Sequence, residues 1–395
     1  MKTIERAVVK ELLRRLSKPP NLLQIVTGPR QVGKTTALQQ VMKRWKGPTH
    51  YASADLPSPP DAYWIEAQWK TARLEAEQKG KTVLLVLDEI QKIHRWADVV
   101  KSLFDEDHRK RIPIRAVLLG SAALILQKNA QESLAGRFER HFCPHWSWPE
   151  CKEAFGWSLD EWMYFGGYPG GAPLKADTEQ RWASYISDSL IDSVLSRDVL
   201  QTVTIAKPAL LRRLFMLAVN SPAQILSYNK MLGQLQDAGN TVTLAHYLDI
   251  LSSAYLVTGL QQWSGGTTRA RASSPKLIIW NNALINALSH LRRRETQQRS
   301  DLWGRLVENA VGAHILNQDI PGLDLYYWRH RDNEVDYVLE MGRDLLLIEV
   351  KGGSVKSSKG LDAFRKEIPR SRALLVGSGG VPLETFFSVP TANWF

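Results

Sequence analysis

The pattern of apolar and polar positions in the first 175 residues predicts a parallel α/β sheet. Short unbroken apolar runs, typical of parallel strands covered on both faces, occur at Leu22–Thr27, Val83–Leu87 and Ala116–Gly120. The first run is followed by Ala37–Trp45, which has the apolar spacing of a helix. We therefore expect alternating strands and helices in this region.

The pattern changes to helical spacing between residues 176 and 275. The stretch Asp177–Leu200 contains no glycine or proline, and Asp177 is a candidate helix cap. Further helices are predicted over Ala209–Ser221, from a cap at Ser227 to a stop at Gly239, and over Thr241–Val257, before a hairpin in the stretch that follows. Two short helices, a turn, a third helix and a hairpin suggest a winged helix.

The residues leave two uses of this helical region open. The third helix carries Thr243, His246, Tyr247 and Asp249 but no arginine or lysine, which favours an ATPase lid or a dimerisation surface over a DNA-reading helix. The basic stretch Thr267–Ser273 in the hairpin favours DNA contact.

The C-terminal third begins with a helix pattern and continues with a β-hairpin. A helix is predicted over Gly304–Leu316, and Asn333–Met341 alternates like a strand, with Val335, Tyr337 and Leu339 on one face. Gly342-Arg343 can make a two-residue turn into the apolar strand that begins at Leu345. Counting outward from this turn places Asp336 opposite Glu349. A helix over Ser358–Pro369 and a strand over Arg372–Gly377 complete the region.

Composition indicates a globular, basic protein. Its 395 residues are 44% hydrophobic and 23% charged, and the net charge is +11. A positive charge of this size favours nucleic acid as a partner, DNA more than RNA. The two cysteines cannot form a disulfide framework, and no apolar run approaches the length of a membrane span, so we expect a cytoplasmic protein that does not enter a membrane.

The most specific motif is a phosphate-binding loop. Gly28–Thr36 (GPRQVGKTT) follows a predicted strand and precedes a predicted helix, which is the setting that G-x-x-x-x-G-K-T requires. Its backbone N–H groups would cradle phosphates, Lys34 would reach the β- and γ-phosphates, and the Thr35 hydroxyl would ligate Mg²⁺. The predicted nucleotide-binding residues of the loop are Gly28, Pro29, Arg30, Gln31, Val32, Gly33, Lys34, Thr35 and Thr36.

Two further strand tips supply candidate partners for ATP and Mg²⁺. Asp88 and Glu89 follow the apolar run that ends at Leu87. Asp88 is placed to hold Mg²⁺ and Glu89 to orient the attacking water. Ser121 follows the third run and lies where a γ-phosphate sensor would sit; the alternative is that it caps a helix.

Four segments make the chain resemble a known family. DEIQKI (Asp88–Ile93), LLGSAA (Leu118–Ala123), ESLAGRFER (Glu132–Arg140) and FGGYP (Phe165–Pro169) are similar to prokaryotic AAA+ ATPases of the AAA_14 type, whose C-terminal half carries a domain of unknown function, DUF4143. His145–Glu150 (HWSWPE) departs from the usual PLSFEE, and we expect its two tryptophans to lie in the core.

The resemblance implies an arginine that acts on ATP of a neighbouring subunit. Arg137 is the candidate and Arg197 a weaker one, and either would require a homo-oligomer. The alternative is that Arg137 pairs with an acidic residue of its own domain.

The C-terminal acids resemble a second family. Glu308 on a helix, Asp336 on a strand, and Glu349 with Lys351 on the next strand are similar to the restriction-endonuclease-like fold, PD-(D/E)xK. The resemblance implies a metal ion, Mg²⁺, held by Asp336 and Glu349, with Lys351 steadying the attacking water or the scissile phosphate. The alternative is an old nuclease scaffold kept for binding.

The sequence thus predicts an α/β protein of three domains. These are a parallel-sheet P-loop AAA+ ATPase (1–175), a winged-helix-like helical domain (176–275) and a restriction-endonuclease-like domain (276–395). We expect Mg²⁺-dependent ATP hydrolysis coupled to a C-terminal domain that binds nucleic acid. The residues leave open whether that domain cuts, whether it is an inactive switch for DNA or protein, and whether the basic surface is incidental to a signalling ATPase.

Overall fold

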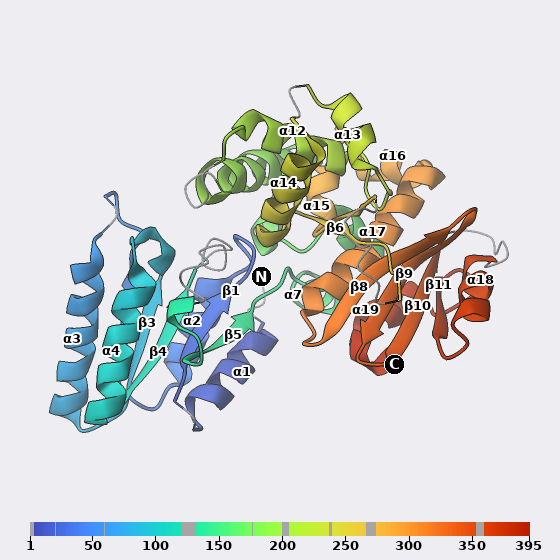
Figure 1. The fold of residues 1–395 in the computed structure, drawn as a ribbon. Helices are drawn as coiled ribbons and strands as arrows, with labels where there is room; N and C mark the ends of the chain where they lie inside the picture. Colours follow the sequence, from blue (N-terminus) through green and yellow to red (C-terminus); the bar gives the residue numbers. More distant parts are fainter. Residues whose placement is uncertain are drawn as a thin grey trace. The chain divides into compact units, whose positions relative to one another are not determined.

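Two compact units make up the chain in the computed structural model (Figure 1). The structure describes residues 4–19, 21–58, 60–120, 132–175, 177–199, 205–236, 239–265, 274–352 and 359–395. Residues 3–144 belong to an N-terminal unit, whereas residues 145–195 and 205–395 belong to a C-terminal unit. The first compact unit therefore ends about thirty residues before the predicted boundary at 175, and the division into three domains stays a prediction.

A five-stranded parallel sheet forms the N-terminal unit, as the apolar runs predicted. Its strand order is β2-β3-β4-β1-β5, and every neighbouring pair is parallel. The strands are β1 (Leu23–Thr27), β2 (Thr49–Ser53), β3 (Val83–Asp88), β4 (Ile114–Leu119) and β5 (Phe138–Phe142). The three central strands are the three apolar runs. The two edge strands are more polar, and the apolar pattern did not predict them.

Helices cover both faces of this sheet. They are α1 (Ala7–Leu16), α2 (Lys34–Arg44), α3 (Ala62–Lys79) and α4 (Trp96–Lys110). Along β3, Val86 packs into the core with α1 and α2, whereas Leu85 and Leu87 pack into the core with α3 and α4. This alternation explains why the strand is apolar at every position.

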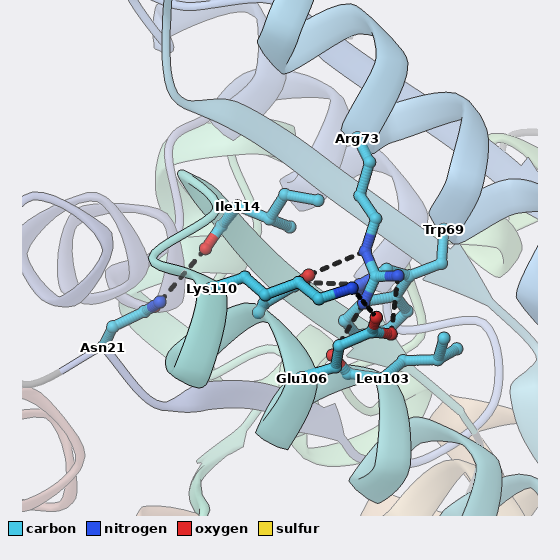
Figure 2. A network of polar contacts seen from close by, with 8 residues as sticks. Asn21, Trp69, Arg73, Leu103, Glu106, Lys110 and Ile114 are labelled. Carbon is cyan, nitrogen blue, oxygen red and sulfur yellow. Dashed lines mark hydrogen bonds and ion pairs between the residues drawn. The ribbon is translucent and has the colours of Figure 1, made fainter.

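A polar network joins α3 to α4 (Figure 2). The Arg73 guanidinium donates to Asp107 at 2.7 Å, to Glu106 at 2.8 Å and to the Leu103 carbonyl at 3.0 Å. The Trp69 indole donates to the other oxygen of Asp107 at 2.7 Å. Because buried Asp107 is bonded on both oxygens, the network fixes the helix pair without leaving an unpaired charge.

Helices dominate the first part of the C-terminal unit. They are α7 (Trp148–Phe155), α8 (Leu159–Phe165), α9 (Ala172–Lys175), α10 (Glu179–Ser184), α12 (Pro208–Val219), α13 (Tyr228–Gln234), α14 (Thr241–Ser253), α15 (Asn282–Asn286) and α16 (Arg293–Gln298). Trp146 and Trp148 are buried, as expected for core substitutions. The helix predicted from Asp177 starts at Glu179 with Thr178 as its cap, and the wider turns of a π-helix continue it to Val199.

The three predicted helices are present in the expected order, whereas most of the predicted hairpin (GLQQW and the Gly-Gly-Thr-Thr stretch) cannot be compared, because residues 266–273 lie outside the described residues. Ser227 caps α13 as predicted, but this helix ends at Gln234, before the predicted stop at Gly239. α14 ends at Ser253, because Tyr255 adopts a left-handed backbone with φ 57°. An antiparallel pair follows, β6 (Val257–Leu260) with β7 (Lys276–Ile279). The basic stretch Thr267–Ser273 lies outside the described residues, and a winged helix stays a prediction.

A four-stranded sheet ends the chain. Its order is β11-β10-β9-β8, parallel between β10 and β11 and antiparallel elsewhere. Its strands are β8 (Leu323–His330), β9 (Asn333–Met341), β10 (Asp344–Lys351) and β11 (Arg372–Gly377), and its helices are α17 (Ser300–Gln318), α18 (Lys359–Glu367) and α19 (Leu383–Ser388). Helix α17 packs into one core with this sheet and α18 into another.

The register of the β9–β10 hairpin is the predicted one. Met341 pairs with Asp344 and Tyr337 with Ile348 around a turn in which Gly342 has φ 63°. One prediction was wrong, since Val335 and Tyr337 lie on opposite faces of β9. Val335 packs into the core that contains α18, whereas Tyr337 packs into the core that contains α17. The pairing of β8 with β9 shifts by one residue at this point, and such a bulge re-aims the side chains beside it.

None of the helices in the described residues is long and apolar enough to span a membrane.

Candidate nucleotide site and acidic cluster

The phosphate loop has the geometry that its sequence predicted. Strand β1 ends at Thr27 and helix α2 begins at Lys34, with Gly33 as its cap at φ 90°. A Cβ atom on Gly28 would lie 2.1 Å from the Cys143 carbonyl oxygen, so this position accepts only glycine. The loop thus packs its backbone against the chain that leaves β5.

Lys34 lies at the centre of this loop. Its side chain is 9% exposed, and its ammonium donates to the carbonyls of Gly28 at 3.0 Å and Pro29 at 2.6 Å. The first turn of α2 and the adjoining N–H groups give this loop the geometry that favours binding of an anion. A positive charge is therefore held where phosphates would bind.

The other loop residues differ in exposure. Val32 is buried, Arg30 is half-buried, and Gln31, Thr35 and Thr36 are exposed. Gln31 has φ 56°, which completes the loop's turn. Buried Arg6 joins the loop to the segment after β5, because its guanidinium donates to the Val32 carbonyl at 3.2 Å and to the Pro144 carbonyl at 2.9 Å.

Asp88 and Thr35 meet at the tip of β3. The Thr35 hydroxyl lies 3.1 Å from Asp88 Oδ2, and the Tyr51 hydroxyl donates to the same oxygen at 3.0 Å. Burial, followed by the charge of Asp88, raises the pKa of Tyr51 to about 12. Oxygen atoms of this kind are the ligands that Mg²⁺ prefers, so the pair fits the ion that the motif implies.

Glu89 is held beside this pair in an unusual backbone conformation. It has φ 55°, and its N–H donates to Asp88 Oδ1 at 2.9 Å. Gln91 donates to its carboxylate at 2.6 Å. Burial and the charge of Asp88 raise the pKa of Glu89, which strengthens it as a base for water.

The remaining nucleotide-site predictions have different outcomes. Ser121 lies outside the described residues, and Arg197 lies in a helical stretch whose side chains are not described. Arg137 forms a two-bond pair with Asp105, at 2.7 and 3.0 Å, which holds the pKa of that carboxyl below its usual value. Arg137 is thus paired with an acidic residue of its own domain. It would have to break this pair before it could act on the ATP of a neighbouring subunit.

The C-terminal acids come together as the register predicted, but around a residue that the sequence reasoning missed. The Lys276 ammonium, at the start of β7, lies 2.5 Å from Glu308 Oε1 and 3.5 Å from Asp336 Oδ1. Lys351 contacts Glu349 at 2.6 Å, which confirms that these two side chains share a face. Lys276 stands between Pro275 and the apolar run Leu277–Trp280. No local sequence pattern linked it to Glu308 or Asp336, which follow more than thirty residues later.

Burial perturbs the ionisation of this cluster. It raises the pKa of Glu308 to about 7, although the Lys276 charge opposes the shift. Burial and the charge of Asp336 raise the pKa of Glu349. Burial alone would lower the pKa of Lys276, but Glu308 and Asp336 outweigh it and keep the lysine charged.

Three family models match successive parts of the chain. Residues 20–152 match a family model described as an AAA domain, AAA_14. The five-stranded parallel sheet of the N-terminal unit matches the fold of P-loop ATPases, in agreement with this match. Residues 303–390 match the domain of unknown function DUF4143, as the resemblance implied, and residues 156–295 match another, DUF8612. The AAA match supports an ATPase, and the descriptions of these three family models do not name a nuclease.

Two mycobacterial relatives extend over nearly the whole chain. They are the uncharacterized proteins Rv2008c of Mycobacterium tuberculosis and Mb2031c of Mycobacterium bovis. Each is 29% identical over 394 residues, which cover 98% of this chain and 84% of the relative.

Solved structures show weaker likenesses. The Walker-type ATPase PABY2304 of Pyrococcus abyssi has a TM-score of 0.47 at 12% identity, over 71% of this chain and 94% of that one. The Aeropyrum pernix Orc1 protein in complex with DNA has a TM-score of 0.31 at 13% identity, over 72% and 91%. Scores this low carry no argument about function.

Proposed function

We propose that this protein binds ATP with Mg²⁺ and hydrolyses it in its N-terminal unit. The observation that carries the proposal is the buried Lys34 ammonium inside a closed glycine loop, beside Thr35 bonded to Asp88. Lys34 would bind the phosphates, and Thr35 and Asp88 would hold the metal ion. Mg²⁺, when bound, neutralises charge on the phosphates.

Glu89 has the position and basicity of the group that takes a proton from water. Its backbone turn and its hydrogen bond from Gln91 fix the carboxylate next to Asp88. Because the carboxylate is buried and its pKa is raised, it is a better base than an exposed glutamate. Glu89 would therefore act in the chemical step and contribute little to ATP affinity.

We expect Glu89→Gln to lower the rate of ATP hydrolysis by about 10²- to 10⁴-fold while ATP binding stays near the wild-type level. Phosphate release with Mg²⁺, and titration with a fluorescent ATP analogue, measure the two quantities separately. Glu77→Gln, an exposed position on α3, is the matched control. Wild-type protein that binds no ATP, or a Glu89→Gln variant with unchanged hydrolysis, would refute the assignment.

A second proposal concerns the partner, which we infer is nucleic acid. The net charge of +11 supports it, and so does the arginine run around α16, where Arg292, Arg294 and Arg299 are exposed. Exposed cations of this kind bind phosphate backbones by releasing counterions. The described part of α14 carries no cation, so the proposal places the contact on the arginine run.

We expect replacement of Arg292, Arg294 and Arg299 by alanine to weaken DNA binding and to flatten its salt dependence. Each phosphate contact adds about one unit to the slope of log affinity against log salt, so the slope should fall by up to about three units. Binding measured between about 50 and 200 mM salt gives this slope. The control replaces Lys81, Arg109 and Arg111, which are exposed on the N-terminal unit. Equal losses in both triple variants would show nonspecific charge binding only.

A further inference from the structure

Lys276 is a fully buried cation in the middle of the C-terminal acids. Its side chain is 0% exposed, and its ammonium contacts carboxylates from two elements, Glu308 of α17 and Asp336 of β9. Glu334, also of β9, lies 3.6 Å away. The ammonium further donates to the Asp336 backbone carbonyl at 3.2 Å and lies 5.0 Å from the centre of the Tyr337 ring. Every side of the ammonium that these contacts describe is negative or electron-rich.

A buried ammonium is stable only when fixed negative groups surround it. The same reasoning applies in reverse, because carboxylates brought this close repel one another unless a cation lies between them. The sequence predicted a divalent metal ion in that role. The structure has a lysine side chain, from a strand outside the hairpin, among the acids that were to surround the metal.

Three of the four carboxylate oxygens of the predicted metal ligands, Asp336 and Glu349, already contact other groups of the protein. Asp336 Oδ1 faces Lys276, and Asp336 Oδ2 accepts the Val350 N–H at 2.8 Å. Glu349 Oε1 contacts Lys351, and its Oε2 is buried without a hydrogen-bond partner. Mg²⁺ is commonly held by one or two carboxylates, with water completing its shell, so the site depends on carboxylate oxygens that are free to bind it. Within the described residues, no group of three or more His, Cys, Asp or Glu is arranged to hold a metal ion.

We propose that Lys276 is a built-in counter-ion that takes the place of the divalent metal in the acidic cluster. Lys276 therefore neutralises Glu308 and Asp336 without a metal, and Lys351 contacts Glu349, so metal-dependent cleavage is absent. The C-terminal unit then engages nucleic acid as a binding module. This last clause rests on the partner proposed above, whereas the counter-ion role stands without it.

Lys276 is also held in place by its own strand. Ile279, three residues along β7, donates its N–H to Asn309 Oδ1 at 2.8 Å, and its carbonyl accepts from Asn309 Nδ2 at 2.8 Å. Asn309 follows Glu308 on α17. The two hydrogen bonds fix β7 against α17, so the lysine and the glutamate face each other as part of the folded core.

Titration of the full-length protein with Mn²⁺ alone, followed by electron paramagnetic resonance, tests the proposal. Every protein would carry Asp88→Asn and no nucleotide, so that the N-terminal unit contributes no Mn²⁺ site. On this background we expect no saturable site with Lys276 present. We expect Lys276→Met to gain one saturable site, which Asp336→Asn in the same chain removes. Lys351→Met is the matched control, since it removes the other lysine of the cluster, and it should gain none.

Thermal unfolding provides a second readout. Lys276→Met should melt at a lower temperature than the parent protein, and Mn²⁺ should restore part of the loss, whereas the melting temperature of the parent should not respond. A saturable Mn²⁺ site in the parent that disappears with Asp336→Asn would overturn the proposal, and this comparison needs no Lys276 variant to fold. A folded Lys276→Met protein that binds no Mn²⁺ would also overturn it.

Discussion

Replacement of Lys34 by alanine should remove ATP hydrolysis almost completely, by at least about a hundredfold, and should weaken ATP binding as well. This ammonium is buried in the loop and is bonded to the Gly28 and Pro29 carbonyls. Arg30, the other cation of the loop, is half-buried, whereas Lys34 is buried in contact with these carbonyls, so we do not expect Arg30 to replace it. Unlike Glu89→Gln, which should spare binding, Lys34→Ala removes a charge that contacts bound phosphates in both the ground state and the transition state.

The matched control is Lys43→Ala, on the same helix. Lys43 lies in the last turn of α2 and is exposed, so its replacement should leave phosphate release and nucleotide affinity near wild type. Phosphate release and analogue titration on both variants give the comparison. Wild-type hydrolysis in Lys34→Ala, or equal losses in the two variants, would contradict the phosphate-loop assignment.

The phosphate loop could be predicted because its chemistry is local. Gly28, Gly33 and Lys34 lie within seven consecutive positions, and the backbone needs them in that order. Arg6 and Tyr51 escaped prediction for the opposite reason. Arg6 reaches the loop from before α1, and Tyr51 reaches Asp88 from an edge strand whose polar sequence gave no apolar signal.

In the β9–β10 hairpin, too, only the features that depend on local sequence could be predicted. Its register followed from a two-residue turn and holds as far as the pair of Tyr337 with Ile348. The next pair outward would be Asp336 with Glu349, and the charge of Asp336 does act on Glu349. The facing of Val335 was not predicted correctly, because a bulge in the pairing with β8 depends on a neighbouring strand. Lys276 lies sixty residues before Asp336, and only the tertiary fold brings its charge to the cluster. The metal site predicted from the sequence therefore left out Lys276, the cation that contacts Glu308 and Asp336 in the structure.

Buried Asn309 joins β7 to α17, and its replacement should strongly destabilise the C-terminal unit. Asn309 is 0% exposed, bonds both backbone groups of Ile279, and donates to Asn282 Oδ1 at 2.9 Å. Asn282 in turn donates to the carbonyls of Met163 and Leu306. We expect Asn309→Ala to lower the free energy of unfolding by roughly 3–5 kcal/mol, because it leaves three buried groups unpaired and opens a cavity.

Urea unfolding followed by tryptophan fluorescence measures this loss. Asn240→Ala is the control, since Asn240 caps α14 at an exposed position and its replacement should cost about 1 kcal/mol. Asn309→Asp keeps the acceptor for the Ile279 N–H but loses both donor bonds, so it should also be strongly destabilised. A midpoint for Asn309→Ala no lower than that of the control would show that β7 does not depend on this clamp. If the clamp is as strong as its geometry indicates, the backbone that carries Lys276 is fixed beside Glu308 by the same interactions that stabilise the fold.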